Sequence, residues 1–316
     1  MNERKIPVVA VLGPTASGKT SLAVDLAIRF GGEVVSCDSM QIYKEMSVST
    51  AKPTPEEMRG VPHHLIDLLP VGTSYSVADY IPAAAKAIAE IDARGNRTFL
   101  CGGTGQYADA LLDGMRFEYG GCPQDIRSEM SFFLQRNGLE ALVARLAAAD
   151  PQAPSLIDVK NPKRVLRALE IVEGEGVPLA RYRERNLSAE RPYDSLKLVI
   201  DFKDRQRLYE RIDRRVEKML ADGLVKEART VYNKNITSTA GQAIGCKELA
   251  DYFAGAKSLD ECVEAVRRAT RRYAKRQQTW FRREADAVFL YADEEDVFAR
   301  AAEACERFYN GEAKSG

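Results

Sequence analysis

Eight consecutive residues near the start of the chain have the types and spacing of a phosphate-binding loop. The segment that matches the pattern G-x-x-x-x-G-K-[ST] is Gly13, Pro14, Thr15, Ala16, Ser17, Gly18, Lys19 and Thr20. In such a P-loop the glycines let backbone N–H groups point at phosphate oxygens, and the next helix adds the positive end of its dipole. We expect Lys19 to reach the terminal phosphate and the Thr20 hydroxyl to bind Mg²⁺. The pattern predicts a phosphoryl or diphosphate ligand and leaves the reaction open.

The elements around this loop alternate as in a parallel α/β sheet. Apolar runs predict buried strands over 7–12, 33–37 and 97–101, with a weaker signal over 64–69. Helical periodicity is found in the segments 19–30 and 77–94. Because the carboxyl ends of parallel strands meet at one edge of a sheet, we expect the loops after these strands to form one site.

The second half of the chain is dominated by helices. Residues 119–192 carry helix-like segments interrupted by prolines, with no convincing strand, and the apolar run 196–202 returns to the sheet. Beyond it the periodicity predicts helices over 205–233, 242–255, 258–284 and 293–309, and a short strand over 288–291. We therefore predict an α/β fold with a P-loop NTPase-like parallel-sheet core (1–117 and 195–316), a small all-helical insertion domain (118–194) and a helical C-terminal region.

Composition excludes some classes of protein and leaves nucleic-acid binding open. The 316 residues are 45% hydrophobic, and no apolar run is long enough for a membrane helix, so we expect a cytoplasmic protein with no membrane partner. The formal net charge is zero, with 46 basic and 46 acidic residues, so the whole chain gives no electrostatic argument for RNA. Two tracts give such an argument locally. Residues 263–283 include eight Arg or Lys residues and one acidic residue, and residues 159–169 include four basic residues and no acidic one. By charge alone, a solvated cationic helix remains the simpler interpretation of the first tract.

Cysteine and histidine are not arranged for metal or redox chemistry. The six cysteines, at positions 37, 101, 122, 246, 262 and 305, include no C-x-x-C pair. The chain has two histidines, His63 and His64, which are adjacent. We expect these histidines to have a structural role and give them no catalytic role.

Two further segments lie where a P-loop fold builds its pocket. Asp38, Ser39, Met40 and Gln41 follow the second predicted strand, and Thr104 lies in a Gly-Gly-Thr-Gly segment after another. An aspartate at the end of a strand can bind Mg²⁺ in a kinase or NTPase, or it can act as a general base. The residue types do not decide between these roles for Asp38.

An ordered set of short segments resembles one enzyme family. The segments are GPTASGKT, DSMQIYK, STAKPT, HHLID, GGTG, NPKRVLRALEI, QAIGCKEL and AKRQQTWFR, spread from Val8 to about Arg283. Together they resemble the tRNA dimethylallyltransferases, the bacterial tRNA isopentenyltransferases. The resemblance implies dimethylallyl diphosphate as donor, Mg²⁺ as cofactor, and N6 of the adenosine just 3′ of the anticodon as acceptor.

The resemblance also implies roles for residues of this chain. Asp38 is similar to the family's general base, Thr104 to the residue beside the bridging oxygen of the leaving diphosphate, and Arg127 to an arginine at the reaction site. Arg211 and Arg215 are expected to help hold the diphosphate. The residues expected to contact the anticodon stem-loop are Asp38, Ser39, Met40, Gln41, Thr104, Arg127, Lys163, Arg164, Val165, Leu166, Arg167, Ile244, Gly245, Cys246, Lys247, Glu248, Arg271, Lys275 and Arg276.

The chain departs from the family pattern at two positions, and three rival functions remain. Gln106 and Cys246 stand where the family usually has leucine and tyrosine, which puts the RNA contact of position 246 in doubt. The rivals are an isopentenyltransferase for free AMP or ATP, a P-loop kinase of small metabolites, and an RNA-binding module without catalysis. The predicted helical insertion and basic helices disfavour the first, since a mononucleotide needs neither. We expect the enzyme to be a monomer.

Overall fold

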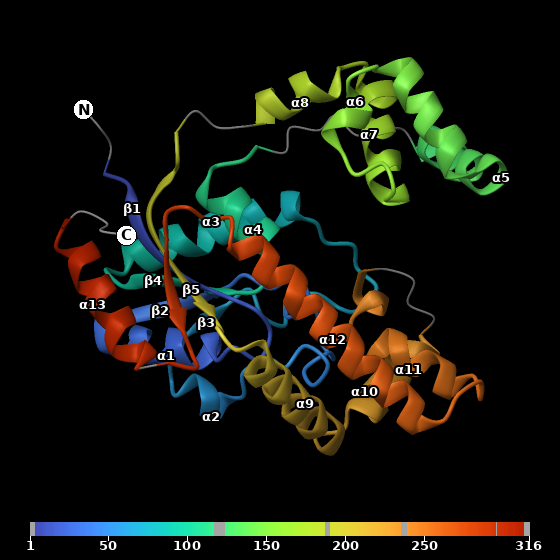
Figure 1. Ribbon diagram of the computed structural model, residues 1–316. Coiled ribbons are helices and arrows are strands. Elements are labelled where there is room, and N and C mark those ends of the chain that lie inside the picture. Colours follow the sequence, from blue (N-terminus) through green and yellow to red (C-terminus); the bar gives the residue numbers. More distant parts are fainter. Residues whose placement is uncertain (1–3, 117–123, 187–189, 235–238, 295, 313–316) are drawn as a thin grey trace. The chain divides into compact units, whose positions relative to one another are not determined.

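A six-stranded parallel sheet forms the centre of the larger part of the chain (Figure 1). The computed structural model describes residues 4–116, 124–186, 190–234, 239–294 and 296–312. The strands are β1 (Ile6–Leu12), β2 (Gly32–Ser36), β3 (His63–His64), β4 (Arg97–Gly102), β5 (Tyr193–Asp201) and β6 (Ala287–Tyr291), in the spatial order β3-β2-β4-β1-β5-β6. The predicted α/β class with a parallel sheet is confirmed.

The register of the central strands brings the predicted site segments together. β1 is covered on both faces, and its residues from Val8 to Leu12 have no exposed surface, as expected for the middle of a parallel sheet. Leu12 pairs with Gly102 of β4 and with Val199 of β5. The P-loop after β1, the Gly-Gly-Thr-Gly segment after β4 and the loop after β5 therefore leave the sheet at the same edge.

Helices cover the two faces of the sheet with separate apolar cores. On one face, α1 (Lys19–Phe30) and α13 (Val297–Tyr309) pack against Val9 and Val11 of β1. On the other, α3 (Val77–Ala93) and α4 (Gly105–Leu112) pack against Val8 and Ala10. The alternation along β1 follows from the two-residue period of a strand, which sends successive side chains to opposite faces.

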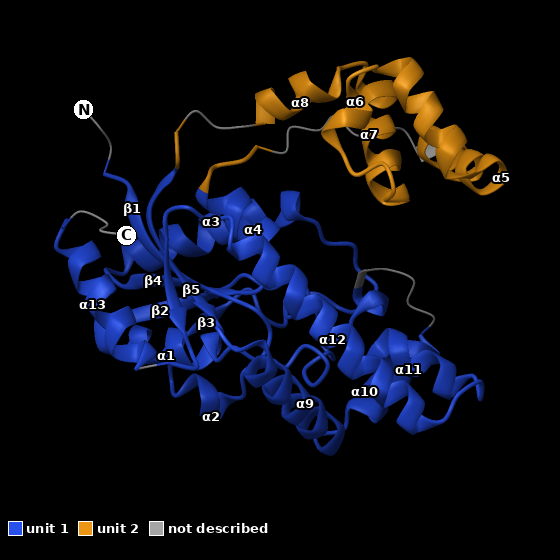
Figure 2. Cartoon of the chain, viewed as in Figure 1, with its two compact units in different colours: residues 1–112, 192–316 blue, residues 113–191 orange. Residues whose placement is uncertain are grey.

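The chain divides into two compact units, residues 1–112 with 192–316 and residues 113–191 (Figure 2). In the described residues, the second unit contains α5 (Gln124–Ala149), α6 (Ala153–Leu156), α7 (Pro162–Glu175) and α8 (Leu179–Asn186). Its core is formed by residues such as Leu142, Leu146 and Leu169, which are fully buried. The unit begins and ends a few residues before the predicted boundaries. Its end lies earlier because strand β5 starts at Tyr193 rather than at residue 196.

Several predicted element bounds were wrong, and glycine explains two of them. The helix predicted over 205–233 is two helices, α9 (Arg205–Ala221) and α10 (Leu224–Asn233), separated at Gly223, where φ is 102°. The helix predicted from residue 242 begins later, as α11 (Cys246–Phe253), because Gly245, with φ of 100°, is its N-cap; a 3-10 turn (Thr239–Gln242) lies before it. A positive φ is compatible with glycine and interrupts a right-handed helix.

The other differences are at element ends. The strand predicted over 64–69 is limited to β3, since Leu65 and Asp67 have positive φ values of 63° and 56°. Two helices are shorter than predicted: α12 (Leu259–Phe281), which is capped by Ser258, and α13, which starts after the cap residue Asp296. One short helix, α2 (Pro55–Met58), was not predicted. Among the described residues, no helix is long and apolar enough to cross a membrane.

A buried carboxylate at the start of β2 holds the edge of the sheet. Glu33 accepts two hydrogen bonds from Arg94, at 3.0 and 2.8 Å, and one from Asn96 at 2.8 Å. His64 of β3 lies 2.6 Å from the same carboxylate. These contacts, the hydrogen bonds from Arg94 foremost, lower the pKa of Glu33 to about 2. His64 thus has the structural role that the sequence suggested.

Replacing Glu33 is expected to make stability less dependent on pH. A carboxyl whose pKa is lower in the folded than in the unfolded chain stabilises the fold above its unfolded pKa, near ~4.3, and loses that effect as pH falls toward the folded pKa. Glu33→Gln should therefore cost about 2 kcal/mol in unfolding free energy at pH 7 and clearly less at pH 3. Urea unfolding at the two pH values measures this. Glu303→Gln, in an exposed pair on α13, is the control; an equal loss for Glu33→Gln at both pH values would contradict the assignment.

Candidate active site

The P-loop follows β1 directly and fits against the end of β5. Gly13 has φ of 152°, and a Cβ atom there would lie 2.6 Å from the Ile200 carbonyl oxygen, so no other residue fits without movement. Gly18, with φ of 94°, precedes the first turn of α1. The loop backbone and the N-terminus of α1 therefore have the placement that the eight-residue pattern predicted.

Two cationic side chains lie at the P-loop, and burial disfavours the charged form of each. The Lys19 ammonium donates a hydrogen bond to the Pro14 carbonyl oxygen, at 3.2 Å. Burial lowers the pKa of Lys19, and it also lowers the pKa of the partly buried Arg215 on α9. The Ser17 hydroxyl is buried and has no hydrogen-bond partner among the described residues. Two desolvated cations and an unused hydroxyl form a site that an anionic ligand would stabilise.

Helix α9 supplies both predicted arginines. Arg211 donates from Nε to the Ala16 carbonyl oxygen at 2.7 Å, which fixes α9 against the P-loop. Arg215 follows one helical turn later. Burial lowers its pKa, and the negative charge of Asp38 acts in the opposite direction and raises it. The structure thus brings Arg211 and Arg215 to the loop, although they are distant from it in sequence.

Asp38 and Thr104 lie where β2 and β4 end, and a hydrogen bond between Ser39 and Thr104 connects the two loops. Asp38 accepts at Oδ1 from the Met40 N–H at 2.9 Å, and no hydrogen bond within the described chain involves its Oδ2. The Thr104 hydroxyl oxygen accepts from the Ser39 N–H at 3.0 Å. Gly102 permits this approach, because a Cβ there would lie 2.0 Å from the Cys37 carbonyl oxygen. A carboxylate with one free oxygen therefore lies beside a fixed hydroxyl.

Helix α12 connects the two loops through one side chain. Gln277 accepts from the Thr15 N–H at 2.8 Å and donates to the Gly103 carbonyl oxygen at 2.8 Å. Tyr273, one turn earlier on α12, lies on the same face of the helix. The sequence placed both on the packed stripe of this helix and did not single them out as site residues. Their regular helical spacing was the available signal, and it does not distinguish core residues from site residues.

The same helix corrects one packing prediction. Trp280 was expected on the buried stripe, but it is 37% exposed, and its indole N–H donates to Asp109 at 2.8 Å. Its ring lies against Gly105, where a Cβ would approach it to 2.3 Å. Gln106, the departure next to this glycine, is exposed on α4, where a polar side chain is readily accommodated.

No cysteine near the loops is suited to nucleophilic attack. Cys37 and Cys101 are buried free thiols. Burial raises the pKa of Cys101 to about 11 and raises the pKa of Cys37 further. Both stay protonated at neutral pH, so neither is a thiolate nucleophile. Cys122 lies outside the described residues.

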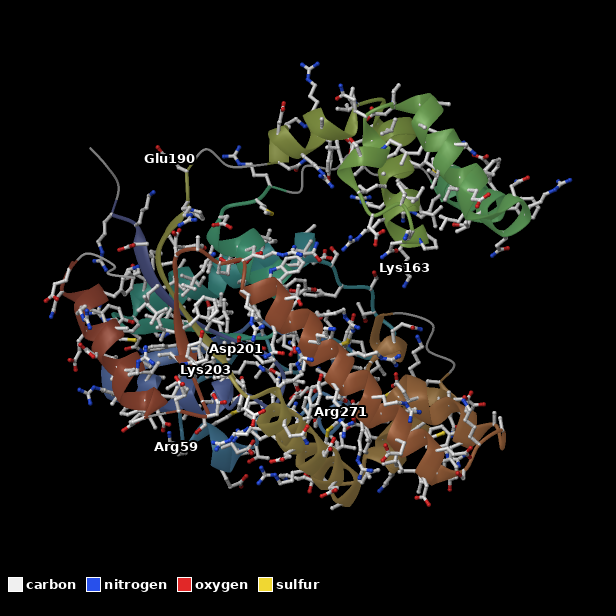
Figure 3. All side chains as sticks on the ribbon, viewed as in Figure 1. Arg59, Lys163, Glu190, Asp201, Lys203 and Arg271 are labelled. Carbon is white, nitrogen blue, oxygen red and sulfur yellow. The ribbon has the colours of Figure 1, made fainter. Side chains whose placement is uncertain are left out.

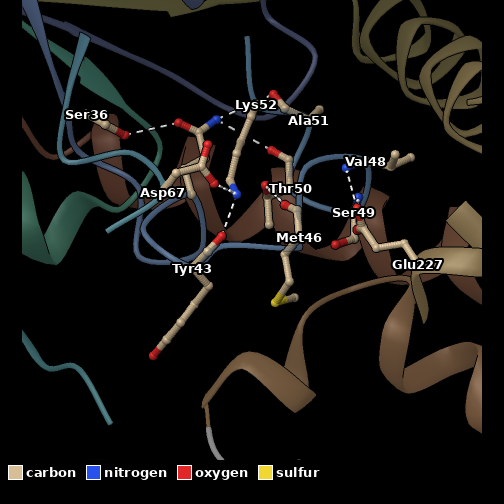
Figure 4. Close-up of polar contacts among 11 residues, drawn as sticks. Ser36, Tyr43, Met46, Val48, Ser49, Thr50, Ala51, Lys52, Asp67 and Glu227 are labelled. Atoms are coloured by element: carbon tan, nitrogen blue, oxygen red, sulfur yellow. Dashed lines mark hydrogen bonds and ion pairs between the residues drawn. The ribbon is translucent and has the colours of Figure 1, made fainter. Parts of the chain in front are cut away.

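The loop after Asp38 is shaped by polar contacts (Figure 4). Gln41 accepts from the Ser36 hydroxyl at 3.0 Å, and its amide group donates to the Ala51 carbonyl oxygen at 3.4 Å. Glu227 of α10 accepts from the Val48 and Ser49 N–H groups, both at 2.8 Å. The Gln41 amide thus supports the loop, and its expected contact with adenine stays a prediction.

The residues predicted to contact RNA fall into two groups by exposure. The exposed ones, five basic side chains, are Lys163, Arg164, Lys247, Lys275 and Arg276. Lys163 extends from the surface of α7 in the second unit (Figure 3). Arg271, Arg127 and Arg167 are paired instead: Arg271 binds Asp213 with a shortest distance of 2.5 Å, while Arg127 and Arg167 share Glu170 at 3.0 and 2.9 Å.

Packing bears on four of the predicted contacts. Val165 is fully buried and Cys246 is 5% exposed, so neither side chain is available to RNA. Gly245 is buried, and Glu248 accepts from its N–H at 2.9 Å in a helix cap. Cys246 belongs to an apolar core with residues of α10. Leu166 and Ile244 are partly buried, in the cores of their units.

Comparison with known proteins decides the family. A family model described as IPP transferase matches residues 41–284, and one described as isopentenyl transferase matches residues 6–73. The chain belongs to the IPP transferase family. Among its relatives, the tRNA dimethylallyltransferase of Shouchella clausii is 43% identical over 307 residues, which are 96% of this chain and 97% of that protein. The protein of that name from Geobacter metallireducens is 43% identical over 290 residues, or 91% of this chain and 93% of its own length.

Solved structures agree with this membership. The full-length tRNA isopentenylpyrophosphate transferase of Bacillus halodurans matches with a TM-score of 0.70 and 39% identity, over 98% of this chain and 96% of that one. A eukaryotic dimethylallyltransferase acting on tRNA matches with a TM-score of 0.82 and 25% identity, over 98% of this chain and 80% of that one. The IPP transferase family and the predicted P-loop NTPase-like core are thus both confirmed.

Proposed function

We propose that this enzyme transfers a dimethylallyl group from dimethylallyl diphosphate to N6 of the adenosine just 3′ of the anticodon in tRNA. The observation that carries the proposal is the placement of Asp38 and Thr104 beside a P-loop surrounded by desolvated cations. The relatives' names, which specify dimethylallyl transfer and tRNA, support the choice of substrates. One site then holds an anionic leaving group on one side and a base for an incoming amine on the other.

The reaction needs one bond broken, one bond formed and one proton removed. The allylic C–O bond breaks and its electron pair leaves with the diphosphate, where Lys19, Arg215 and the loop N–H groups stabilise the new charge. The N6 lone pair forms the new bond to the allylic carbon, and the N6 proton passes to Asp38. Thr104 lies beside the bridging oxygen. A substrate carbon that shares its positive charge over three carbons needs no covalent enzyme intermediate, in keeping with the protonated cysteines.

The site fits Mg²⁺ bound through the diphosphate. Among the residues that the structure describes, no three His, Cys, Asp or Glu side chains are grouped to hold a metal ion. A Mg²⁺ ion typically binds through one or two side chains together with phosphate oxygens and water. The Thr20 hydroxyl in the first turn of α1 is the side-chain oxygen that would hold it, while the free Oδ2 of Asp38 is left to act as the base. Bound there, Mg²⁺ would offset the charge of the diphosphate.

For the RNA we propose a smaller set of contacts than the sequence did. The exposed basic side chains of α7, α11 and α12 (Lys163, Arg164, Lys247, Lys275 and Arg276) are the ones most open to phosphates, although Arg164 also forms an ion pair of 4.0 Å with Asp158. Arg127, Arg167 and Arg271 remain candidates if the RNA exchanges their carboxylate partners. We propose that the target adenosine is contacted by Gln41 and by Ser39 and Met40, the two residues that follow the general base Asp38. We place the enzyme in the cytoplasm with its tRNA substrate and propose that it acts as a monomer, since the proposed diphosphate and base residues come from one chain.

The direct test is a transfer assay with Mg²⁺ and labelled dimethylallyl diphosphate, with unmodified tRNA and AMP offered in parallel. We expect label in tRNA only, on an adenosine identified by mass spectrometry of nucleosides. Label on AMP would assign the enzyme to the mononucleotide isopentenyltransferases. No label on either, with ATP consumed when small metabolites are added, would indicate a P-loop kinase.

A further inference from the structure

A glutamate of α10 that the proposed reaction does not use binds the loop that follows Asp38. The two carboxylate oxygens of Glu227 accept hydrogen bonds from the N–H groups of Val48 and Ser49, both at 2.8 Å (Figure 4). Glu227 lies in the first turn of its helix, 178 positions after Ser49 in the chain. A carboxylate has two oxygens that only accept, so it satisfies two adjacent N–H groups at once. Glu227 therefore fixes one turn of this loop to α10.

The turn that this glutamate holds, residues 46–52, is closed by bonds of its own. The Ala51 N–H donates to the Val48 carbonyl oxygen at 3.0 Å, and the Thr50 hydroxyl donates to the Met46 carbonyl oxygen. These bonds join the start of the turn to its end, which makes it one compact piece. A group that fixes Val48 therefore also fixes the carbonyl groups of Thr50 and Ala51.

Those two carbonyl groups receive the side chain of Gln41. Its Nε2 lies 3.5 Å from the Thr50 carbonyl oxygen and 3.4 Å from that of Ala51, and its Oε1 accepts from the Ser36 hydroxyl at 3.0 Å. Rotating the carboxamide by half a turn would place Oε1 against two oxygens that cannot donate. The amide oxygen uses one of its two lone pairs here, which leaves the other for a ligand. The position of the turn thus sets the orientation of Gln41, three residues after Asp38.

Apolar contacts hold the same loop against α10 without fixing its direction. Ile42, Tyr43 and Met46 are buried in one core with Leu224. Apolar contacts are non-directional, so a small shift of the loop along the helix costs them little. The two hydrogen bonds to Glu227 are directional and resist such a shift. We therefore expect the loop to stay folded without this carboxylate and to lose its exact position.

We propose that Glu227 is a positioning residue that holds Gln41, through the turn 46–52, in the orientation in which Gln41 contacts the target adenosine. Glu227 acts through the turn and touches neither substrate. The inference rests on the proposed function, because it uses the proposed contact between Gln41 and the adenosine. It predicts slower transfer to tRNA with unchanged affinity for dimethylallyl diphosphate, since other side chains, Gln277 and Arg211, hold the P-loop.

The test measures transfer to tRNA by Glu227→Gln, which keeps the size of the side chain but replaces one acceptor oxygen by an NH₂ group. We expect kcat to fall about 10- to 100-fold, the cost of a misplacement of about 1 Å, with KM for dimethylallyl diphosphate unchanged. In a Gln41→Ala background the same substitution should change kcat less than about twofold, because the group that it positions is gone. Glu90→Gln, in a 4.0 Å surface pair on α3, is the matched control and should leave kcat unchanged.

A second measurement follows the loop without any substrate. Hydrogen exchange, read by mass spectrometry of peptides, should show faster exchange of residues 44–52 in Glu227→Gln than in the wild type, because two amides lose their shared acceptor. Peptides from β1 should exchange at the wild-type rate. Faster exchange throughout the chain, β1 included, would overturn the inference, since Glu227 would then hold the fold rather than position Gln41.

The outcomes in the transfer assay separate this inference from the function on which it rests. Normal kcat in Glu227→Gln overturns the inference alone, provided that the wild-type enzyme is active. An equal loss in the wild-type and Gln41→Ala backgrounds also overturns it, since Glu227 would then act independently of Gln41. A wild-type enzyme that transfers nothing to tRNA overturns the proposed function and, with it, the role given to Gln41.

Discussion

Asp38→Asn is expected to lower the rate of transfer about 10²- to 10⁴-fold, the usual contribution of a positioned general base. Asparagine keeps the Oδ1 acceptor that binds the Met40 N–H, so the loop should hold its shape while the basic oxygen is lost. Single-turnover transfer at saturating substrate measures the chemical step, and filter binding measures tRNA affinity. We expect the tRNA affinity to stay close to the wild-type value.

A matched carboxylate elsewhere provides the control for this variant. Asp92 on α3 contacts Arg4 at 3.4 Å at the surface, and Asp92→Asn should leave transfer unchanged. Near-normal turnover in Asp38→Asn would rule out its role as the base. A parallel loss of tRNA affinity would instead mean that Asp38 mainly binds the adenosine.

Lys19→Ala is expected to lower kcat/KM for dimethylallyl diphosphate about 10²- to 10³-fold, with tRNA affinity unchanged. In the proposed mechanism, the Lys19 ammonium is the P-loop charge that stabilises the leaving diphosphate. Because burial disfavours the charged form of Lys19 when no anion is bound, the variant should be at least as resistant to heat as the wild type. Steady-state kinetics with varied diphosphate and a thermal unfolding curve measure the two effects.

An exposed lysine separates this effect from a general loss of charge. Lys86 on α3 is 78% exposed at its side chain, and Lys86→Ala should match the wild type in both measurements. If Lys19→Ala kept a normal kcat/KM, the P-loop would not be the diphosphate site. A large drop in unfolding temperature would show that Lys19 supports the fold rather than a ligand.

The site segments that come directly after a strand in the sequence were predictable. The P-loop, Asp38 and Thr104 each follow a short apolar run, and parallel strands place their carboxyl ends at one edge. Local composition fixes these positions because strand, turn and helix signals lie within a few residues of each other. The glycine at position 223 was also a visible signal for the break between α9 and α10, although helical periodicity on both sides concealed it.

The part of the site built by distant residues was not predictable from local pattern. Gln277 binds the backbone of Thr15, which lies 262 positions earlier in the chain. A helical stripe predicts that such a residue packs, and it does not say against what. The sequence does not show ion pairs between distant residues for the same reason. Arg271 is one of eight basic residues in its tract, yet its guanidinium forms an ion pair with Asp213 of α9. Burial of Cys246 likewise depends on α10, which the sequence did not separate from α9.

N6 of one tRNA adenosine is the proposed acceptor of the dimethylallyl group, and removing that amine is the most direct test. Two otherwise identical anticodon stem-loops, one with adenosine and one with inosine just 3′ of the anticodon, are incubated with enzyme, Mg²⁺ and labelled dimethylallyl diphosphate. We predict label in the adenosine RNA and none in the inosine RNA, which lacks the amine but keeps the ring. Equal labelling of both RNAs would contradict transfer to N6 at this position.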